Sequence, residues 1–101
     1  MKSDADTRMI AELWAVICDR AEHPSEESYT SRLLTDEKKG IDKVLEKVGE
    51  EATEFILAVK NGKDERTVEE CADLLYHLLV ALRAAGIDLD DVMTELGKRR
   101  K

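Results

Sequence analysis

The chain has 101 residues, of which 43% are hydrophobic, 39% charged and 4% aromatic, and its formal net charge is −7. This length fits one domain, residues 1–101, with a modest core of its own. The acidic balance argues against a nucleic-acid partner, because phosphate backbones need a basic face, and no apolar run approaches the length that crosses a membrane.

A first helix is predicted from about Asp6 to Ala21, with Asp4 or Asp6 as its cap and His23-Pro24 as its end. The N-terminal MKSDADTRM lacks the basic-then-apolar order of a signal peptide, so we expect a cytoplasmic protein. Residues at helical spacing form one apolar stripe: Met9, Ile10, Leu13, Trp14, Ile17 and Cys18. A polar connection follows, around a short helical turn that carries Leu33 and Leu34.

A second helix is predicted from about Gly40 to Lys60, and Asn61-Gly62 supplies its C-terminal stop. The stripe expected to be buried comprises Ile41, Val44, Leu45, Val48, Ala52, Phe55, Ile56 and Val59. The helix also carries three glutamates within five residues, at positions 50, 51 and 54. Like charges three or four residues apart on a helix repel one another, so this crowding needs a reason.

A third helix is predicted from about Glu65 to Ala85, with Asp64 or Thr67 as its cap and Gly86 after its end. The run LLYHLLVAL, residues 74–82, is apolar on almost every side, which is typical of a helix buried on more than one face. One small chain cannot easily cover such a helix, so we expect a partner subunit. Asp88 is predicted to cap a short fourth helix through Leu96.

No alternating strand pattern bounded by turn residues occurs, so the fold class is all-α, a helical bundle. Cys18 and Cys71 sit at apolar helical positions and are interpreted as small core residues in a reducing compartment. The basic run Lys98, Arg99, Arg100 and Lys101 is interpreted as a solvated tail that favours a helix C-terminus, with phosphate contact as the alternative.

Acidic residues of the second and third helices are predicted to meet. At about 100° per residue, one side of the second helix carries Lys43, Lys47, Glu50 and Glu54, and Glu51 lies nearer the apolar seam. On the third helix Glu70, Asp73 and His77 share a side. A short turn makes the two helices antiparallel neighbours, so the carboxylates can surround one polar cleft. Repulsion among them becomes attraction around a hard divalent cation such as Mg²⁺.

Several of these residues also have simpler interpretations. An E-E-x-x-E pattern alone also fits a solvated helix face, and Glu70 fits a capping box that starts at Thr67. His77 lies in an apolar run and can be a satisfied core residue, or a ligand or base. Tyr29 and Tyr76 can be packing residues with a polar tip. Di-iron bundles use Glu-x-x-His on two helices, and Asp73-x-x-x-His77 does not match that pattern.

Glu50-Glu51-x-x-Glu54 followed by Glu70-x-x-Asp73 resembles the signature of the all-α, MazG-like nucleotide pyrophosphohydrolases. More narrowly, the blocks SYTSRLL, KVGEEATE and EECADLLYHLLV, with the ending GIDLDDVMTELGKR, resemble the phosphoribosyl-ATP pyrophosphohydrolase family of histidine biosynthesis. The resemblance covers nearly the whole chain after about Ile10. Cys71 stands where that family more often has alanine.

The resemblance implies an enzyme that hydrolyses phosphoribosyl-ATP to phosphoribosyl-AMP and pyrophosphate with Mg²⁺, the second step of histidine biosynthesis. It implies a bundle of the MazG-like type completed by dimerisation, as a homodimer or a dimer of dimers. Two rivals remain. One is a house-cleaning (deoxy)nucleoside triphosphate pyrophosphohydrolase, and the other is a non-catalytic helical dimerisation module with an acidic surface.

Roles in this reaction follow for individual residues. The expected Mg²⁺ ligands are Glu50, Glu51, Glu54 and Asp73, with Glu70 as a fifth catalytic acid, and one carboxylate should activate the attacking water. Lys47 could hold a phosphate or form an ion pair with Glu51. The further candidates for substrate binding are Lys43, Arg32, Tyr29, Thr30 and His77.

Overall fold

The computed structural model describes residues 5–100, and within this range the chain forms five α-helices and no strand, which confirms the all-α prediction. In chain order the helices are α1 (Arg8–Glu22), α2 (Tyr29–Leu34), α3 (Ile41–Lys60), α4 (Asp64–Ala84) and α5 (Leu89–Arg99). The short helical turn expected around Leu33 is α2, and α5 continues past its predicted end at Leu96. Asp4 and Lys101 lie outside the described residues.

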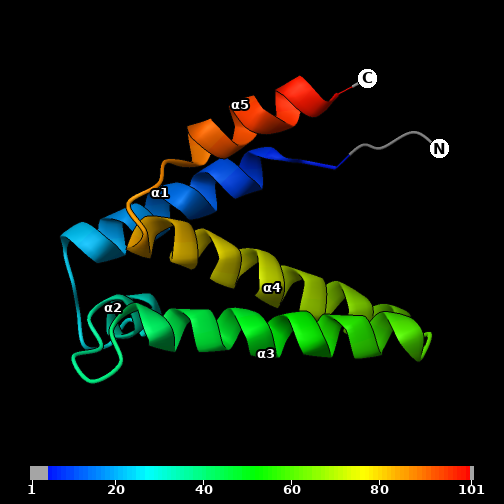
Figure 1. Cartoon of the computed structure of the whole chain (residues 1–101), viewed down its shortest axis with the longest axis horizontal. Helices are drawn as coiled ribbons and strands as arrows, with labels where there is room; N and C mark the ends of the chain where they lie inside the picture. Colours follow the sequence, from blue (N-terminus) through cyan, green and yellow to red (C-terminus); the bar gives the residue numbers. More distant parts are fainter. Residues whose placement is uncertain (1–4, 101) are drawn as a thin grey trace.

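The centre of the fold is the antiparallel hairpin of α3 and α4, which lie side by side along most of their length (Figure 1). The turn between them follows from Gly62, whose φ of 66° is accessible to glycine at low cost. The Gly62 N–H donates to the Val59 carbonyl, and the Lys63 N–H donates to the Ala58 carbonyl, each at 3.1 Å. This pair of bonds is a Schellman motif, and it satisfies the last carbonyls of α3 within a very short connection.

The helix starts were predicted less well than the stops. Asp88 caps α5 as expected, because its side chain accepts from the Asp90 N–H at 2.9 Å. At α4 both predicted caps are wrong, since Lys63 is the N-cap residue and the helix begins at Asp64. Thr67 lies inside α4 and its hydroxyl donates to the Lys63 carbonyl. The capping box therefore does not form, which leaves Glu70 free for another role.

A small core joins all five helices. Its buried members are Ile17 of α1, Leu33 of α2, Val44 of α3, Leu79 and Val80 of α4, and Leu89 of α5. The short α2 is also anchored by polar contacts, because the Ser31 hydroxyl donates to the Arg20 carbonyl at 2.9 Å and the Ser31 N–H donates to the side-chain oxygen of the N-cap residue Ser28 at 3.1 Å. Cys18 and Cys71 are half-buried free thiols.

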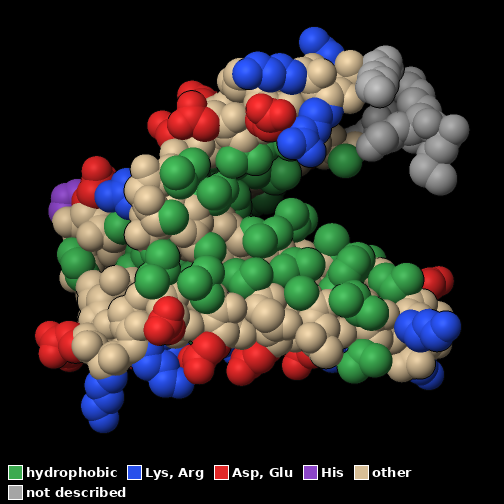
Figure 2. All heavy atoms as spheres, in the orientation of Figure 1, with side chains coloured by type: hydrophobic (Ala, Val, Ile, Leu, Met, Phe, Trp, Pro, Cys, Tyr) green, Lys and Arg blue, Asp and Glu red, His purple; other side chains and the backbone are tan. Residues whose placement is uncertain are grey.

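Much of the predicted apolar stripe is exposed in the single chain. Met9 is 60% exposed, and on α3 Ile56 and Val59 are 62% and 52% exposed. The pair α1 and α5 diverges from the α3–α4 hairpin, and the space-filling view shows a notch between the two arms with hydrophobic side chains on both walls (Figure 2). None of the described helices has an apolar stretch long enough to span a membrane.

Candidate metal centre and active site

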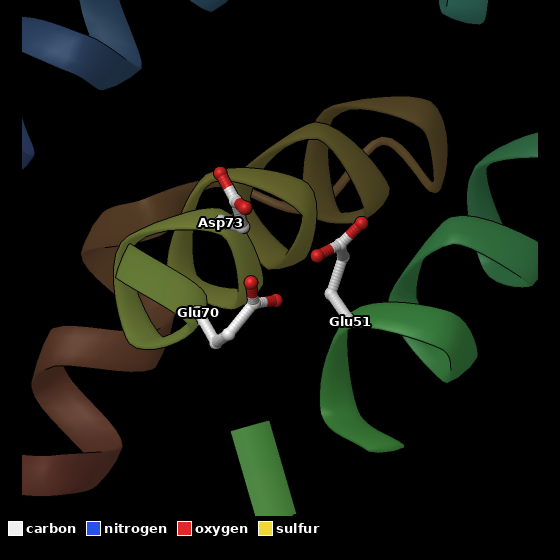
Figure 3. Close-up of side chains that lie close together, drawn as sticks. All are labelled: Glu51, Glu70 and Asp73. Carbon is white, nitrogen blue, oxygen red and sulfur yellow. The ribbon is translucent and has the colours of Figure 1, made fainter. Parts of the chain in front are cut away.

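Three carboxylates converge where α3 and α4 face each other. Glu51 reaches across from α3, and Glu70 and Asp73 reach from α4 (Figure 3). One oxygen from each side chain lies within 4.8 Å of one oxygen of the other two. A slight contraction would let all three bind one divalent cation at about 2.1 Å, the distance that Mg²⁺ prefers.

Helix geometry explains this convergence. Glu70 and Asp73 are three residues apart, so they lie on the same side of α4. That side faces Glu51 because the tight turn at Gly62 fixes α4 antiparallel to α3. The three acids therefore come from one continuous hairpin, and their spacing depends on the register between its two helices.

The donor set fits a cation rather than an ordinary acidic surface. Glu51 and Glu70 are 7% and 3% exposed, and the buried Oε2 atom of each has no hydrogen-bond partner among the described residues. A buried oxygen without a partner costs roughly 1–3 kcal/mol, and more when it is charged. Oxygen ligands with unused lone pairs facing a common point are what a hard divalent ion needs.

The neighbours of Glu70 favour its protonated form. Hydrogen bonding with the facing carboxyl of Glu54 is the main effect that raises the pKa of Glu70, burial raises it further, and repulsion from the charges of Glu54 and Asp73 adds to the effect. Arg66 opposes the shift, since its guanidinium lies 2.8 Å from Oε1 of Glu70. Without a cation, Glu70 therefore holds a proton more readily than an isolated glutamate does.

The other two acids of the E-E-x-x-E pattern lie at the edge of this cluster. Glu54 is exposed but close enough to Glu70 to shift its pKa. The side chain of Glu50 is 61% exposed and accepts from Lys47 at 3.1 Å. Neither belongs to the close trio, so their role as metal ligands stays a prediction.

Two basic residues border the cluster. The ammonium of Lys47 lies 3.1 Å from Glu50 and 3.6 Å from Glu51, and its hydrogen bond to the Glu50 carboxylate raises the pKa of Lys47. The ion pair with Glu51, one of the two alternatives for Lys47, is therefore present, and the phosphate contact stays a prediction. Arg66 pairs with both Glu69 and Glu70, and sequence reasoning missed it. The signal was available, because Arg66 and Glu70 are spaced i, i+4 on one helix.

The candidates for substrate binding are divided between two regions. Tyr29 and Thr30 of α2 contact α4. The Tyr29 hydroxyl forms a hydrogen bond with Nε2 of His77 at 3.1 Å, and the Thr30 hydroxyl forms one with the Tyr76 hydroxyl. His77 in turn contacts the backbone carbonyl of Asp73 through Nδ1 at 2.7 Å. This group therefore adjoins the acid cluster.

The remaining candidate bases have partners other than the three acids. Arg32 donates to the Glu26 carbonyl at 2.8 Å, and its guanidinium carbon is 6.0 Å from the centroid of the Tyr29 ring. The charge of Lys43 acts on Asp36, in the connection before α3. In the basic tail, Arg99 forms an ion pair with Glu95 at 3.2 Å. Phosphate contacts by these residues stay predictions.

Comparison with known proteins identifies the family of the chain. Residues 10–100 match the family described as phosphoribosyl-ATP pyrophosphohydrolase. A protein of Methanoregula boonei named phosphoribosyl-ATP pyrophosphatase is 69% identical, over 99% of this chain and 95% of its own length. Proteins of the same name from Methanosphaerula palustris and Methanoculleus marisnigri are 65% and 64% identical, each over 95% of this chain and over 96% and 98% of their own lengths. The chain therefore belongs to the phosphoribosyl-ATP pyrophosphohydrolase family.

Proposed function

We propose that this chain hydrolyses phosphoribosyl-ATP to phosphoribosyl-AMP and pyrophosphate, the second step of histidine biosynthesis, with Mg²⁺ and in the cytoplasm. Family membership supports the substrate. The observation that carries the chemistry is the pair of buried, unpartnered oxygens of Glu51 and Glu70 beside Asp73.

The reaction is the attack of water between the α- and β-phosphates, with pyrophosphate as the leaving group. Such transfers depend on positioning and charge neutralisation rather than on covalent chemistry by the protein. We assign Glu51, Glu70 and Asp73 as the residues that hold the Mg²⁺, with Glu50 and Glu54 as further acids at its edge. When bound, the ion neutralises phosphate charge and lowers the pKa of water.

Residues around the trio have complementary roles in this proposal. One acid that does not bind the cation deprotonates or orients the attacking water. Glu54 is well placed for this role, because it is exposed and lies next to Glu70. Lys47 and Arg66 each donate to carboxylates of this region. Both could exchange a carboxylate partner for a phosphate oxygen when substrate binds.

We also propose that the chain acts as a homodimer or a dimer of dimers. Its exposed apolar residues are too numerous for a monomer of this size. The large apolar residues that are more than 40% exposed include Met9, Val16, Ile41, Leu45, Ile56, Leu57, Val59, Val68, Leu75, Leu78, Met93 and Leu96. A second copy seated on these surfaces would bury them.

The direct test is pyrophosphate release from phosphoribosyl-ATP, measured beside a panel of ribo- and deoxyribonucleoside triphosphates with and without Mg²⁺. We expect release from phosphoribosyl-ATP only in the presence of Mg²⁺. Preferred turnover of a nucleoside triphosphate would favour the house-cleaning activity instead. No turnover of any of these compounds by folded protein would favour the non-catalytic dimerisation module.

Magnesium alone should stabilise the protein, because it relieves repulsion among the three acids. With a dissociation constant of about 1 mM, 10 mM Mg²⁺ adds about 1.4 kcal/mol to the free energy of unfolding. For a domain of this size the melting temperature then rises by roughly 6–11 °C, measured by calorimetry. NaCl at equal ionic strength is the control for general screening. An equal rise with NaCl would contradict a specific cation site.

A further inference from the structure

Two hydroxyl contacts fasten α2 to α4 beside the acid cluster, and one of them ends on a buried histidine. His77 is 5% exposed, whereas Tyr29 is 42% exposed. The Tyr29 hydroxyl lies 3.1 Å from Nε2 of His77, and the two rings meet edge to face at 82°. The buried imidazole therefore has little access to a ligand, and the tyrosine has more.

The direction of both hydrogen bonds of His77 follows from its partners. Nδ1 lies 2.7 Å from the Asp73 carbonyl oxygen, which can only accept, so Nδ1 carries the proton. In a neutral imidazole the other nitrogen is then an acceptor. The Tyr29 hydroxyl must donate its single proton to Nε2. What this hydroxyl offers to a ligand is therefore an oxygen with lone pairs and no proton.

The Tyr29 hydroxyl also lies close to the proposed reaction centre. Burial raises the pKa of Tyr29, the nearby charge of Lys47 opposes this, and the charges of Glu51 and Glu50 reinforce it. The group therefore remains a hydroxyl, and the charges of the acids of α3 act on it. Its histidine partner is one helical turn from Asp73. A substrate whose phosphates are held at the trio would bring its adjacent sugar toward this oxygen.

We propose that Tyr29 recognises a ribose hydroxyl of the substrate and that His77 is its positioning residue, because Nε2 of His77 accepts the hydrogen bond of the tyrosine hydroxyl and leaves Oη free only to accept. This inference rests on the proposed function, because in phosphoribosyl-ATP the α-phosphate is esterified to a ribose whose 2′- and 3′-hydroxyls are hydrogen-bond donors. A phosphate oxygen cannot donate and gains nothing from this acceptor. His77 thus acts through Tyr29, without touching the substrate.

The test compares phosphoribosyl-ATP with forms that lack the 2′- or the 3′-hydroxyl on the ribose next to the triphosphate, all at pH 8. The wild-type protein should show about a tenfold lower kcat/KM for one of the deoxy forms, as expected for one lost hydrogen bond. In Tyr29→Phe, kcat/KM should fall about tenfold for phosphoribosyl-ATP and should not change for that deoxy form. The loss should lie mainly in KM, because the contact is made in ground state and transition state alike.

Two histidine variants separate positioning from packing. His77→Asn retains a donor near the Nδ1 position but has no atom at the Nε2 position, so it should behave as Tyr29→Phe does. His77→Gln can place an acceptor near Nε2 and should restore the discrimination. Tyr76→Phe removes the matching hydroxyl from the neighbouring contact with Thr30 and should leave the discrimination unchanged. Circular dichroism and the melting temperature check the fold of each variant.

Four results would overturn the inference while leaving the proposed function intact. The first three are equal wild-type turnover of all three substrates, an equal loss of turnover on every substrate in Tyr29→Phe, and wild-type discrimination in His77→Asn. An equal effect of Tyr76→Phe would also overturn it, since simple docking of α2 would then explain the data. If folded wild-type protein releases no pyrophosphate from phosphoribosyl-ATP, the proposed function fails and this inference fails with it.

Discussion

Asp73→Asn should lower Mg²⁺-dependent pyrophosphate release by at least about 100-fold, because even outer-shell partners of a metal site cost 10–100-fold when they are lost. The amide removes the charge of one of the three converging carboxylates at nearly constant shape. Asp73 is exposed, and its bond to His77 uses the backbone carbonyl, so the substitution leaves the helix packing in place. The measurement is kcat/KM at saturating Mg²⁺, with circular dichroism to verify helix content.

Further variants test whether the loss is specific to the three acids of the cluster. Glu51→Gln should lose about as much activity as Asp73→Asn, and the double variant should lose little more, because residues that act as one unit are not additive. Glu69→Gln is the control, since Glu69 is an exposed acid on the same helix that pairs with Arg66 at 3.3 Å. Its activity should stay within about twofold of the wild type, as is usual for an exposed ion pair. Wild-type turnover in Asp73→Asn would exclude this residue from the site.

Leu75→Glu should convert the proposed dimer into monomers. Leu75 is 46% exposed on α4, and it lies about 200° around the helix from Asp73 at 100° per residue, so the acid cluster is not disturbed directly. An unpaired charge buried in an apolar interface costs about 3–5 kcal/mol. The dimer dissociation constant should therefore rise by roughly 10²–10⁴-fold, as measured by sedimentation equilibrium.

Two further variants distinguish burial from charge. Leu75→Lys should dissociate the dimer as Leu75→Glu does, because desolvation and not the sign of the charge sets the cost. Ala15→Glu should leave the dimer intact, since Ala15 is exposed on α1, two positions from the buried Ile17 and four before the exposed Asp19. If neither Leu75 variant changes the mass of the particle in solution, the interface lies elsewhere.

Helix content and helix stops were predictable because each had a local cause. The periodicity of apolar residues marked the helices, and Gly62 and Gly86 end α3 and α4 in left-handed backbone conformations that glycine adopts easily. The start of α4 was not predictable from residue type. Asp64 and Thr67 both suit an N-cap, yet Lys63 takes that position without any side-chain cap, because the short connection after Gly62 fixes where the helix begins.

The site was predictable in composition but not in detail. Spacing along one helix gives relative angles, and it placed Glu70 and Asp73 together. It does not say which side of α3 turns toward α4, because α3 has apolar residues on more than one face. The sequence placed Glu51 nearer the apolar seam than Glu50, and in the structure Glu51 is the buried member of the trio while Glu50 is exposed. The contact of Tyr29 with His77 spans 48 residues, and no local pattern could reveal it.

Because of the Schellman turn at Gly62, ion binding and substrate selectivity depend on different parts of the fold. Since Glu51, Glu70 and Asp73 all belong to one hairpin, an extra residue between Asn61 and Lys63 would break this turn and shift α4 relative to α3, which would carry its two acids away from the third. Changes that loosen α1 or α5 leave this register alone. When the molecule is partly unfolded, the hairpin should therefore still bind the ion after the selectivity for the substrate is lost.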